Sequence, residues 1–404
     1  MEIRENPNLN PNPNISDDLL MTNILPRLPP KSLIRYKTVC KQWRSIISNP
    51  NFIESNLRLS KTNHNNNGVL VPSLSKSLSR ERVETLTYIS YDDFSTTDFQ
   101  FNKSKYGFYN LGSCNGLQCC WLNCGEMCVW NPITSECRKI PDPLAEYPCQ
   151  YVSGFGYIPS LDDYKLVILD LREVIRVYCY TLRSCDTEWK QLYADIGLGR
   201  ISPLYGYLCP GIVLPNSKSH WLVRYNIDDY NNEDDLIILG FDMEMDTINT
   251  VNPPEEIIVA WQQRIRIRHS GVYTCLSSIK DDLCIAMTAR AYGEGVSGCL
   301  QVWRLERYGD SSSWNKFLKL NNVEIPTSSC NFFTLYESRD GVKLLTHSTS
   351  KVWSLYLKSK SDHQIITLHE WFEDETSQYW EYFVPAVSYV ESLVSPFMTY
   401  NQRT

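Results

Sequence analysis

The sequence predicts a small all-α module followed by a large all-β domain. Residues 16 to 53 carry apolar side chains spaced by three and four residues, the period of an amphipathic helix. After Gly68 and as far as about Pro396, short runs rich in β-branched and aromatic residues alternate with turn residues. Within these runs an aliphatic–aromatic strand recurs at intervals of roughly 50 to 60 residues. The change of period divides the 404 residues into two parts.

The first predicted helix begins at Ser16 or Asp17. Either side chain can accept a hydrogen bond from the free N–H groups of a first helical turn. Pro29-Pro30 ends this helix and presets the backbone for the start of the next one. Its apolar stripe consists of Leu19, Leu20, Ile24, Leu25 and Leu28.

A second helix is predicted after Pro30, and Pro50 is expected to end it. Its apolar positions are Leu33, Tyr36, Cys40, Trp43 and Ile47. A segment of this size rarely holds a stable core alone, so its apolar face requires a partner. The alternative is an amphipathic helical hairpin that packs on the rest of the chain.

The β-rich part of the chain contains a repeated unit. Each unit has an apolar run, an aliphatic–aromatic strand, a polar turn and a further strand. Such a unit, repeated with loops of varying length, predicts a β-propeller-like ring. A β-sandwich of similar strands is the alternative. The aromatic positions are Trp130, Tyr178, Phe241, Trp303 and Trp353.

Composition excludes several classes of function. A net charge of −7 argues against general affinity for nucleic acid or anionic membranes. No uninterrupted apolar run approaches about eighteen residues, so no membrane span is expected. Five cations and no acid occur between Lys31 and Arg44, which indicates either a solvated helix face or steering toward an acidic partner.

The cysteines predict a reducing environment. There are 15 of them, and the N-terminus has no signal-peptide pattern, so we expect free thiols and a cytoplasmic or nuclear location, or both. The densest group lacks a paired Cys-x2-Cys, which favours buried thiols over a metal site. This group is Cys114, Cys119, Cys120, Cys124 and Cys128.

No catalytic constellation is found in the sequence. Residues Gly293 to Gly298 fit Gly-x-Gly-x2-Gly, but a strand pattern follows where a dinucleotide site needs a helix. There is no Gly-x-Ser-x-Gly elbow and no phosphate-binding Gly-x4-Gly-Lys loop, and the 6 histidines are scattered. We therefore expect no enzyme activity, no cofactor and no metal.

An alternating arginine motif is a candidate for target recognition. Arg264, Arg266 and Arg268 would share one face of a strand, and guanidinium groups suit carboxylates or phosphates. The alternative is a solvated outer strand whose charges discourage edge-to-edge aggregation.

The helical segment resembles the F-box. The matching blocks are Leu28-Pro29, Lys31-Ser32-Leu33 and Val39-Cys40-Lys41-x-Trp43-Arg44, all at the right spacing. The segment departs at its start, where Ile15-Ser16 stands in place of the Leu-Pro or Ile-Pro of many F-boxes. The resemblance implies helices that dock on the acidic Skp-type adaptor of an SCF ubiquitin ligase, and through it on cullin and RING subunits.

The β-rich part resembles the F-box-associated domain of plant F-box proteins, a group that includes kelch-related and S-locus members. The likeness rests on Ser113–Leu117, Val129–Thr134, Gly154–Tyr157 with Asp162–Lys165, and Glu391–Leu393. Residues 1–14 are rich in Asn and Pro and are expected to form a disordered tail. With the resemblance, the predicted division continues with an F-box helical module at 15–60, an F-box-associated β domain at 61–396 and a tail at 397–404.

The resemblance implies a non-catalytic substrate receptor. The F-box would bind the adaptor, and the β domain would hold a target protein whose identity and pathway the sequence does not name. The alternatives are a β-propeller enzyme with a helical N-terminus, which would need a metal or base in its channel, and an F-box scaffold that delivers no target. The implied adaptor contacts are Leu19, Leu20, Ile24, Leu25, Leu28, Pro29, Leu33, Val39, Cys40 and Trp43.

Overall fold

The computed structural model describes residues 19–62, 67–74, 84–91, 93, 95–100, 108–122, 126–143, 151–172, 174–183, 188–204, 209–225, 235–266, 271–279, 281–290, 298–323, 332–338, 341–347, 351–357, 363–370 and 387–397. Several predicted features lie outside these ranges: the tail at residues 1–14, the N-cap at Ser16 or Asp17, Cys124, Arg268 and the C-terminal tail beyond Phe397. Within the described residues, no helix has the length and apolar character needed to cross a bilayer.

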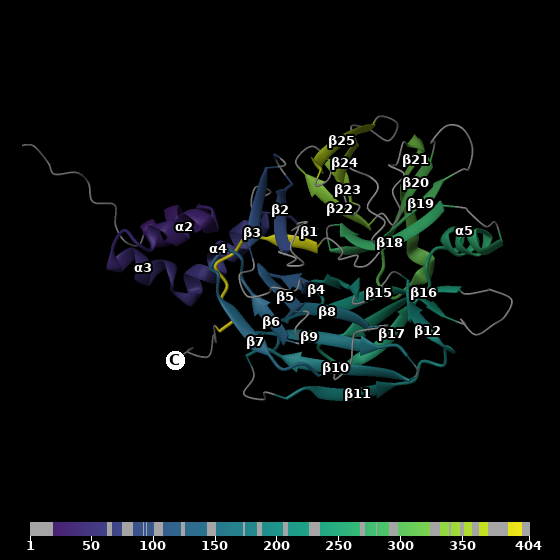
Figure 1. Ribbon diagram of the computed structural model, residues 1–404, viewed down its shortest axis with the longest axis horizontal. Coiled ribbons are helices and arrows are strands. Elements are labelled where there is room, and N and C mark those ends of the chain that lie inside the picture. The colour runs from purple at the N-terminus through teal and green to yellow at the C-terminus, as the bar shows by residue number, and fades with distance from the viewer. Residues whose placement is uncertain are drawn as a thin grey trace, which may run out of the picture.

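Short helices form the first part of the chain, as the apolar spacing predicts (Figure 1). A π-helical turn, η1 (Leu20–Ile24), runs directly into a 3-10 turn, η2 (Leu25–Arg27), so the first helix is short and irregular. Helix α2 (Pro30–Tyr36) starts at Pro30, whose ring presets φ and whose missing N–H would have had no helical partner. Helices α3 (Lys41–Ile47) and α4 (Pro50–Thr62) follow.

The predicted second helix is wrong in its extent, because two helices take its place. A turn over residues 37–39 separates α2 from α3. Cys40 has an extended backbone, and its Sγ accepts a hydrogen bond from the Trp43 N–H at 3.4 Å, so Cys40 caps α3. Pro50 begins α4 instead of ending the helix before it. The apolar spacing continues across the turn, so the period alone could not locate this break.

Six mostly antiparallel sheets follow in the described part of the chain, and Figure 1 shows them arranged as a ring. The first contains β4 (Phe108–Cys114), β5 (Leu117–Leu122), β6 (Glu126–Trp130) and β7 (Cys137–Ile140). The second contains β8 (Tyr151–Ile158), β9 (Asp163–Asp170), β10 (Ile175–Thr181) and β11 (Lys190–Ala194), with β13 (Cys209–Pro210) parallel to β8. The third contains β12 (Ile201–Pro203), β14 (Ile212–Leu214), β15 (Lys218–Tyr225), β16 (Asp235–Asp242) and β17 (Thr247–Val251).

Two further sheets complete the repeated part. One contains β18 (Gly271–Ile279), β19 (Asp282–Arg290), β20 (Gly298–Leu305) and β21 (Trp314–Val323). The other contains β22 (Phe332–Ser338), β23 (Gly341–His347), β24 (Lys351–Leu357) and β25 (His363–Glu370). Helix α5 (Glu255–Arg266) and the 3-10 turn η4 (Ser311–Ser313) lie in connections between strands.

The recurring aromatic residues occupy equivalent strands of these five sheets. Each lies in the third strand of an antiparallel run of four, counted in chain order along the sheet (β8-β9-β10-β11 in the second sheet and β12-β15-β16-β17 in the third), which is the placement that a repeated four-stranded unit requires. The prediction of a β-propeller is therefore confirmed, and the sandwich alternative is wrong. The residues are Trp130 in β6, Tyr178 in β10, Phe241 in β16, Trp303 in β20 and Trp353 in β24.

The remaining sheet, called the closing sheet below, joins the two ends of the domain. It contains β26 (Val387–Val390), β1 (Asn67–Leu74), β2 (Glu84–Ser90) and β3 (Thr96–Gln100), in that order. Strand β26 pairs antiparallel with β1, with Asn67 opposite Val390 and Leu70 opposite Val387. This pairing covers an edge of β1 that would otherwise expose unpaired backbone groups.

A buried asparagine holds the residues that follow β26, called the C-terminal segment below (Glu391–Val394). Asn131 Nδ2 donates to the carbonyl oxygens of Ser392 at 3.1 Å and Val394 at 2.7 Å. Its Oδ1 accepts from the Ile133 N–H at 2.8 Å. Asparagine suits this position because its side chain both donates and accepts. The C-terminal segment is thereby fixed against the sheet that contains β6.

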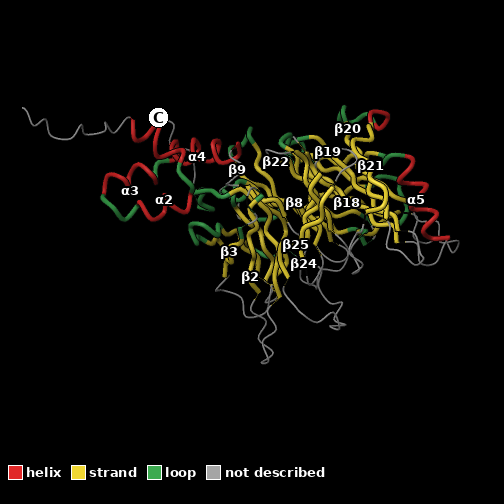
Figure 2. The backbone as a smooth tube through the Cα atoms, turned by 90° about the horizontal axis from the view of Figure 1, so that it is seen from above, coloured by secondary structure: helices red, strands yellow, loops and turns green. Residues whose placement is uncertain are grey.

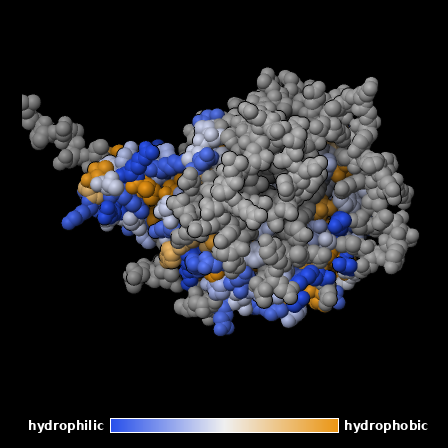
Figure 3. All heavy atoms as spheres, in the orientation of Figure 1, coloured by the Kyte–Doolittle hydropathy of each residue, from blue (hydrophilic) through white to orange (hydrophobic). Residues whose placement is uncertain are grey.

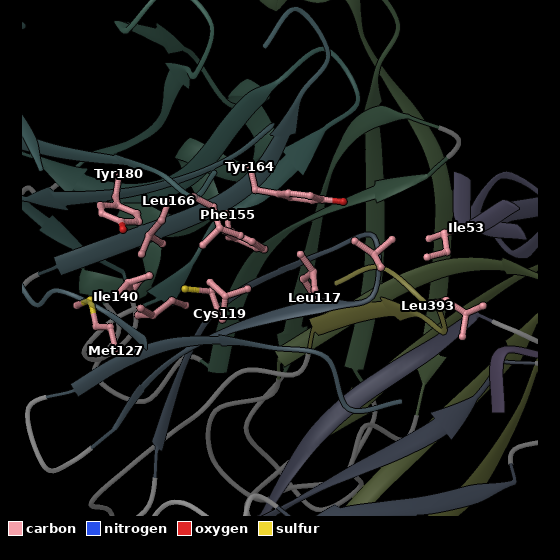
Figure 4. Close-up of a cluster of buried hydrophobic side chains, with 14 of the residues drawn as sticks. Ile53, Leu117, Cys119, Met127, Ile140, Phe155, Tyr164, Leu166, Tyr180 and Leu393 are labelled. Carbon is pink, nitrogen blue, oxygen red and sulfur yellow. The ribbon is translucent and has the colours of Figure 1, made fainter. Parts of the chain in front are cut away.

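One hydrophobic cluster joins the helical module to the propeller (Figure 4). Ile53 of α4 and Leu393 of the C-terminal segment belong to the same cluster as Leu117, Phe155 and Tyr180 of the first two sheets. All five side chains are buried. The module therefore covers part of its apolar surface with the propeller of its own chain.

The predicted burial of the cysteine group is confirmed for its described members. Cys119, Cys120 and Cys128 are buried free thiols, and Cys114 is a half-buried one. Cys119 and Cys120 belong to different hydrophobic clusters, as expected for neighbours on a strand. Burial raises the pKa of Cys114 to about 11, so the neutral thiol is favoured at neutral pH.

His220 is buried in β15. Its Nδ1 lies 3.3 Å from the Ile212 carbonyl oxygen, and its Nε2 lies 2.7 Å from the Tyr308 hydroxyl. A carbonyl oxygen only accepts, so Nδ1 carries the proton and the neutral Nε2 accepts from Tyr308. Burial lowers the pKa of His220 to about 4, because a charged imidazolium would lose its water.

The free energy of unfolding should fall as the pH drops from 6.5 toward about 4. Over this window the unfolded chain takes up a proton at His220 that the folded chain does not, which lowers stability by up to about 3 kcal/mol. We expect His220→Gln to show a smaller difference in urea stability between the two ends of the window. Tyr308→Phe, which keeps the imidazole, should retain the difference. An unchanged pH slope in His220→Gln would contradict this account.

Loss of the Asn131 side chain should destabilise the closed ring. Asn131→Leu leaves two buried carbonyl oxygens without donors, which costs about 2 to 4 kcal/mol in urea denaturation followed by tryptophan fluorescence. The matched control is Asn315→Leu, because Asn315 is exposed and donates only to Glu306 among the described hydrogen bonds. The control should change stability by about 0.5 kcal/mol or less. Equal losses in the two variants would exclude a special role for Asn131.

Candidate functional site

The predicted contact residues of the helical module divide by exposure. Leu25 and Leu33 are 1% and 0% exposed and belong to the cluster that joins the module to the propeller. They hold the module together and are not available to a partner. Half-buried residues packed against the same cluster are Leu20, Leu28 and Trp43. The remaining residues are exposed: Leu19, Ile24, Pro29, Val39 and Cys40.

The exposed apolar residues lie where helices meet turns. Leu19 is 44% and Ile24 is 37% exposed beside η1, and Val39 is 61% exposed in the turn before α3. Figure 3 shows apolar side chains interspersed with hydrophilic ones over the surface of the module. Burying these aliphatic side chains against another molecule would remove apolar area from water, so the three positions are available to a partner.

Internal hydrogen bonds hold the Leu28-Pro29 block in place. Asn56 of α4 is 1% exposed, and its Nδ2 donates to the carbonyl oxygens of Pro26 at 2.9 Å and Leu28 at 3.2 Å. Beyond α2, the ring of Trp43 meets Tyr36 edge-on at 5.6 Å between centroids. The polypeptide that carries the exposed residues is therefore ordered from within the module.

The five cations between Lys31 and Arg44 do not share one environment. Arg35, Lys41 and Arg44 are exposed. Burial lowers the pKa of Lys37, which Glu136 of the propeller partly offsets and Arg44 reinforces. Lys31 instead points to the closing sheet. Of these five cations, Arg35, Lys41 and Arg44 can therefore face a partner.

The predicted strand of arginines is wrong. Arg264 and Arg266 lie in the last turn of α5, so this part of the motif is helical and does not form the predicted strand. The helix has acidic Glu255 and Glu256 in its first turn, and it buries Ile257 and Trp261 at four-residue spacing. The helix that begins at Glu255 continues through the alternating arginines as far as Arg266, so the alternation does not indicate a strand there.

Most of the Gly-x-Gly-x2-Gly pattern lies outside the described residues, and a strand follows it. Strand β20 begins at Gly298 and pairs antiparallel with β19, so a hairpin stands where a dinucleotide site needs a strand and a helix. Across the described residues, no three or more His, Cys, Asp or Glu side chains gather in a way that could hold a metal ion.

Three polar residues that organise the module were missed in the sequence. Asn56, Asn131 and Glu391 are each nearly inaccessible to solvent and bind backbone atoms or charges from distant parts of the chain. The Asn131-Pro132 and Glu391-Ser392 pairs belonged to the quoted motifs, but their roles depend on contacts that no local pattern specifies.

Comparison with known proteins agrees with this division of the chain. Residues 14–55 match the F-box domain, and residues 77–396 match the F-box associated beta propeller domain. An F-box/kelch-repeat protein of Arabidopsis thaliana is 23% identical over 74% of this chain and 78% of its own length.

Two other relatives from Arabidopsis thaliana are matched over shorter stretches. One putative F-box protein is 25% identical over 59% of this chain and 57% of its own length. Another is 29% identical over 41% of this chain and 44% of its own length. The family match covers most of the chain and agrees with the helical module and the ring of sheets. The chain therefore belongs to the F-box proteins that carry an F-box associated β-propeller domain.

Proposed function

We propose that this protein is the substrate-recognition subunit of an SCF-type ubiquitin ligase. Its F-box docks on a Skp-type adaptor and through it on cullin and RING subunits, and its propeller binds a target protein. The observation that carries the proposal is the division of the F-box residues: Leu25 and Leu33 are buried, whereas Ile24 and Val39 are exposed on an ordered scaffold.

The exposed residues suit a stable protein interface. A standard interface takes roughly 800 Å² from each partner, with apolar anchors at its centre and charges at its rim. Ile24 and Val39 supply aliphatic anchors, and the exposed Arg35, Lys41 and Arg44 supply positive charge. An acidic adaptor would be steered toward these cations, which raises the association rate more than the affinity.

The proposed role requires no bond chemistry within this chain. A receptor that holds a target beside a charged ubiquitin-conjugating enzyme raises the effective concentration of the target's lysines. The proposed complex is located in the cytoplasm, the nucleus or both, where the free thiols of this chain stay reduced.

Charge at the two exposed anchors should abolish adaptor binding without unfolding the chain. In Ile24→Asp/Val39→Asp, each carboxylate would be desolvated at the interface, so we expect affinity for a purified Skp-type adaptor to fall by about 100-fold or more in calorimetry. The thermal unfolding midpoint should stay near that of the wild type, because both side chains already contact water.

Two further variants make this test specific. Leu161→Asp changes a residue of the propeller that is 56% exposed, and it should bind the adaptor like the wild type. Leu33→Ala should instead lower stability by about 2 to 5 kcal/mol, since Leu33 is buried. Wild-type affinity in the double aspartate variant would refute the assigned docking residues.

A further inference from the structure

Lys31 of the F-box reaches across to the propeller. Its Nζ lies 2.9 Å from Oε1 of Glu391 and 3.2 Å from Oγ1 of Thr97. It also lies over two aromatic rings, 5.4 Å from the centroid of Tyr88 and 5.3 Å from that of Phe99. Each of these partners belongs to the closing sheet or directly follows it. One ammonium group from α2 is therefore bound by an ion pair, a hydrogen bond and two cation–π contacts.

The partner carboxylate is held in a protected place. The side chain of Glu391 is 6% exposed, whereas that of Lys31 is 37% exposed. Tyr88, Phe99 and Tyr389 form a group of rings with centroids 5.7 to 6.4 Å apart. Burial and then the charge of Glu391 raise the pKa of Tyr88 and Tyr389, which keeps both phenols neutral. A carboxylate among neutral rings is costly unless a cation compensates it.

The protein backbone that carries Glu391 cannot move freely. Ser392 follows it and is 0% exposed, its Oγ donates to the Asn115 carbonyl oxygen at 2.6 Å, and Asn131 binds its carbonyl oxygen. Leu393 then enters the cluster shared with the F-box. The contacts that close the ring therefore also fix the position of the Glu391 carboxylate. Figure 2 shows the module at one end of the strands, beside the ring.

We propose that Lys31 is a positioning residue that fixes the orientation of the F-box on the propeller. Relative motion is the default for two domains of one chain unless their interface is extensive and apolar. Here the shared core limits separation, and the hydrogen bond of Lys31 to Thr97 and its contacts with the two rings limit rotation of α2 over the closing sheet. The inference rests on the proposed function for its purpose: a fixed orientation holds a bound target at one distance from the adaptor.

The proposal is tested by the distance between the two domains in the full-length chain. Dyes attached through unnatural amino acids at Gln42 of α3 and at Met245, both exposed, report this distance by single-molecule energy transfer. The wild type should give one narrow distribution. Lys31→Met keeps the aliphatic stem but removes the charge, and it should broaden the distribution about twofold or add a second population.

Rescue separates orientation from general damage. Lys31→Glu and Glu391→Lys should each broaden the distribution, and the two together should narrow it again in part, because the exchange restores the ion pair but not the cation–π contacts with Tyr88 and Phe99. Lys41→Met, which removes an exposed lysine of the same module, should leave the wild-type distribution unchanged. If Lys31→Met folds poorly, Glu391→Gln removes the other charge of the same ion pair at nearly the same side-chain volume. It should also broaden the distance distribution.

The distance measurement tests the role of Lys31, and the adaptor-binding measurement tests the proposed function. A narrow, unshifted distribution in both Lys31→Met and Glu391→Gln would overturn the role of Lys31. Absence of wild-type binding to the purified Skp-type adaptor would overturn the proposed function, while the distance measurement on the free chain would still stand. If both hold, Lys31→Met should bind the adaptor with unchanged affinity and differ only in its distance distribution.

Discussion

The contact between the C-terminal segment and the sheet that contains β6 supports most of the rest of the structure. Asn131 binds two carbonyl oxygens of this segment, and Ser392 returns a hydrogen bond to the turn that carries Asn115. Strand β26, which precedes the segment, completes the closing sheet beside β1. Because a propeller buries both faces of each sheet against neighbours, an open seam would expose two faces at once. The same few residues also set the place where the F-box attaches.

This attachment explains how a short helical module is stable on a large β domain. Modules of this size bury too little surface to fold well alone, and here Ile53 and Leu33 share a core with residues of the propeller. Sharing the core has a functional consequence. One apolar side of the module is buried against the propeller. Leu19, Ile24 and Val39 remain at the surface, where another polypeptide can bind them.

The buried polar residues act differently from the apolar ones. Hydrophobic contacts hold the domains together without specifying an angle, since they are not directional. The hydrogen bonds of Asn56, of Asn131 and of Lys31 with Thr97 have defined geometry. A receptor that must present one partner to another benefits from both kinds of contact. Lys31 and Glu391 also depend on one another, because replacing either residue leaves the charge of the other without a partner.

The sequence by itself determined the division into helices and strands, the repeat of the propeller and the family of the F-box, because these depend on local period and on residues close in the chain. It could not separate α2 from α3, whose apolar spacing continues through the turn at 37–39, and it mistook the end of α5 for a strand. Only the tertiary structure decided that Leu25 and Leu33 face inward while Val39 faces water. It alone revealed the closing sheet and the pairing of Lys31 with Glu391. Those features join residues from opposite ends of the chain, and a local sequence pattern does not specify which distant residues come into contact.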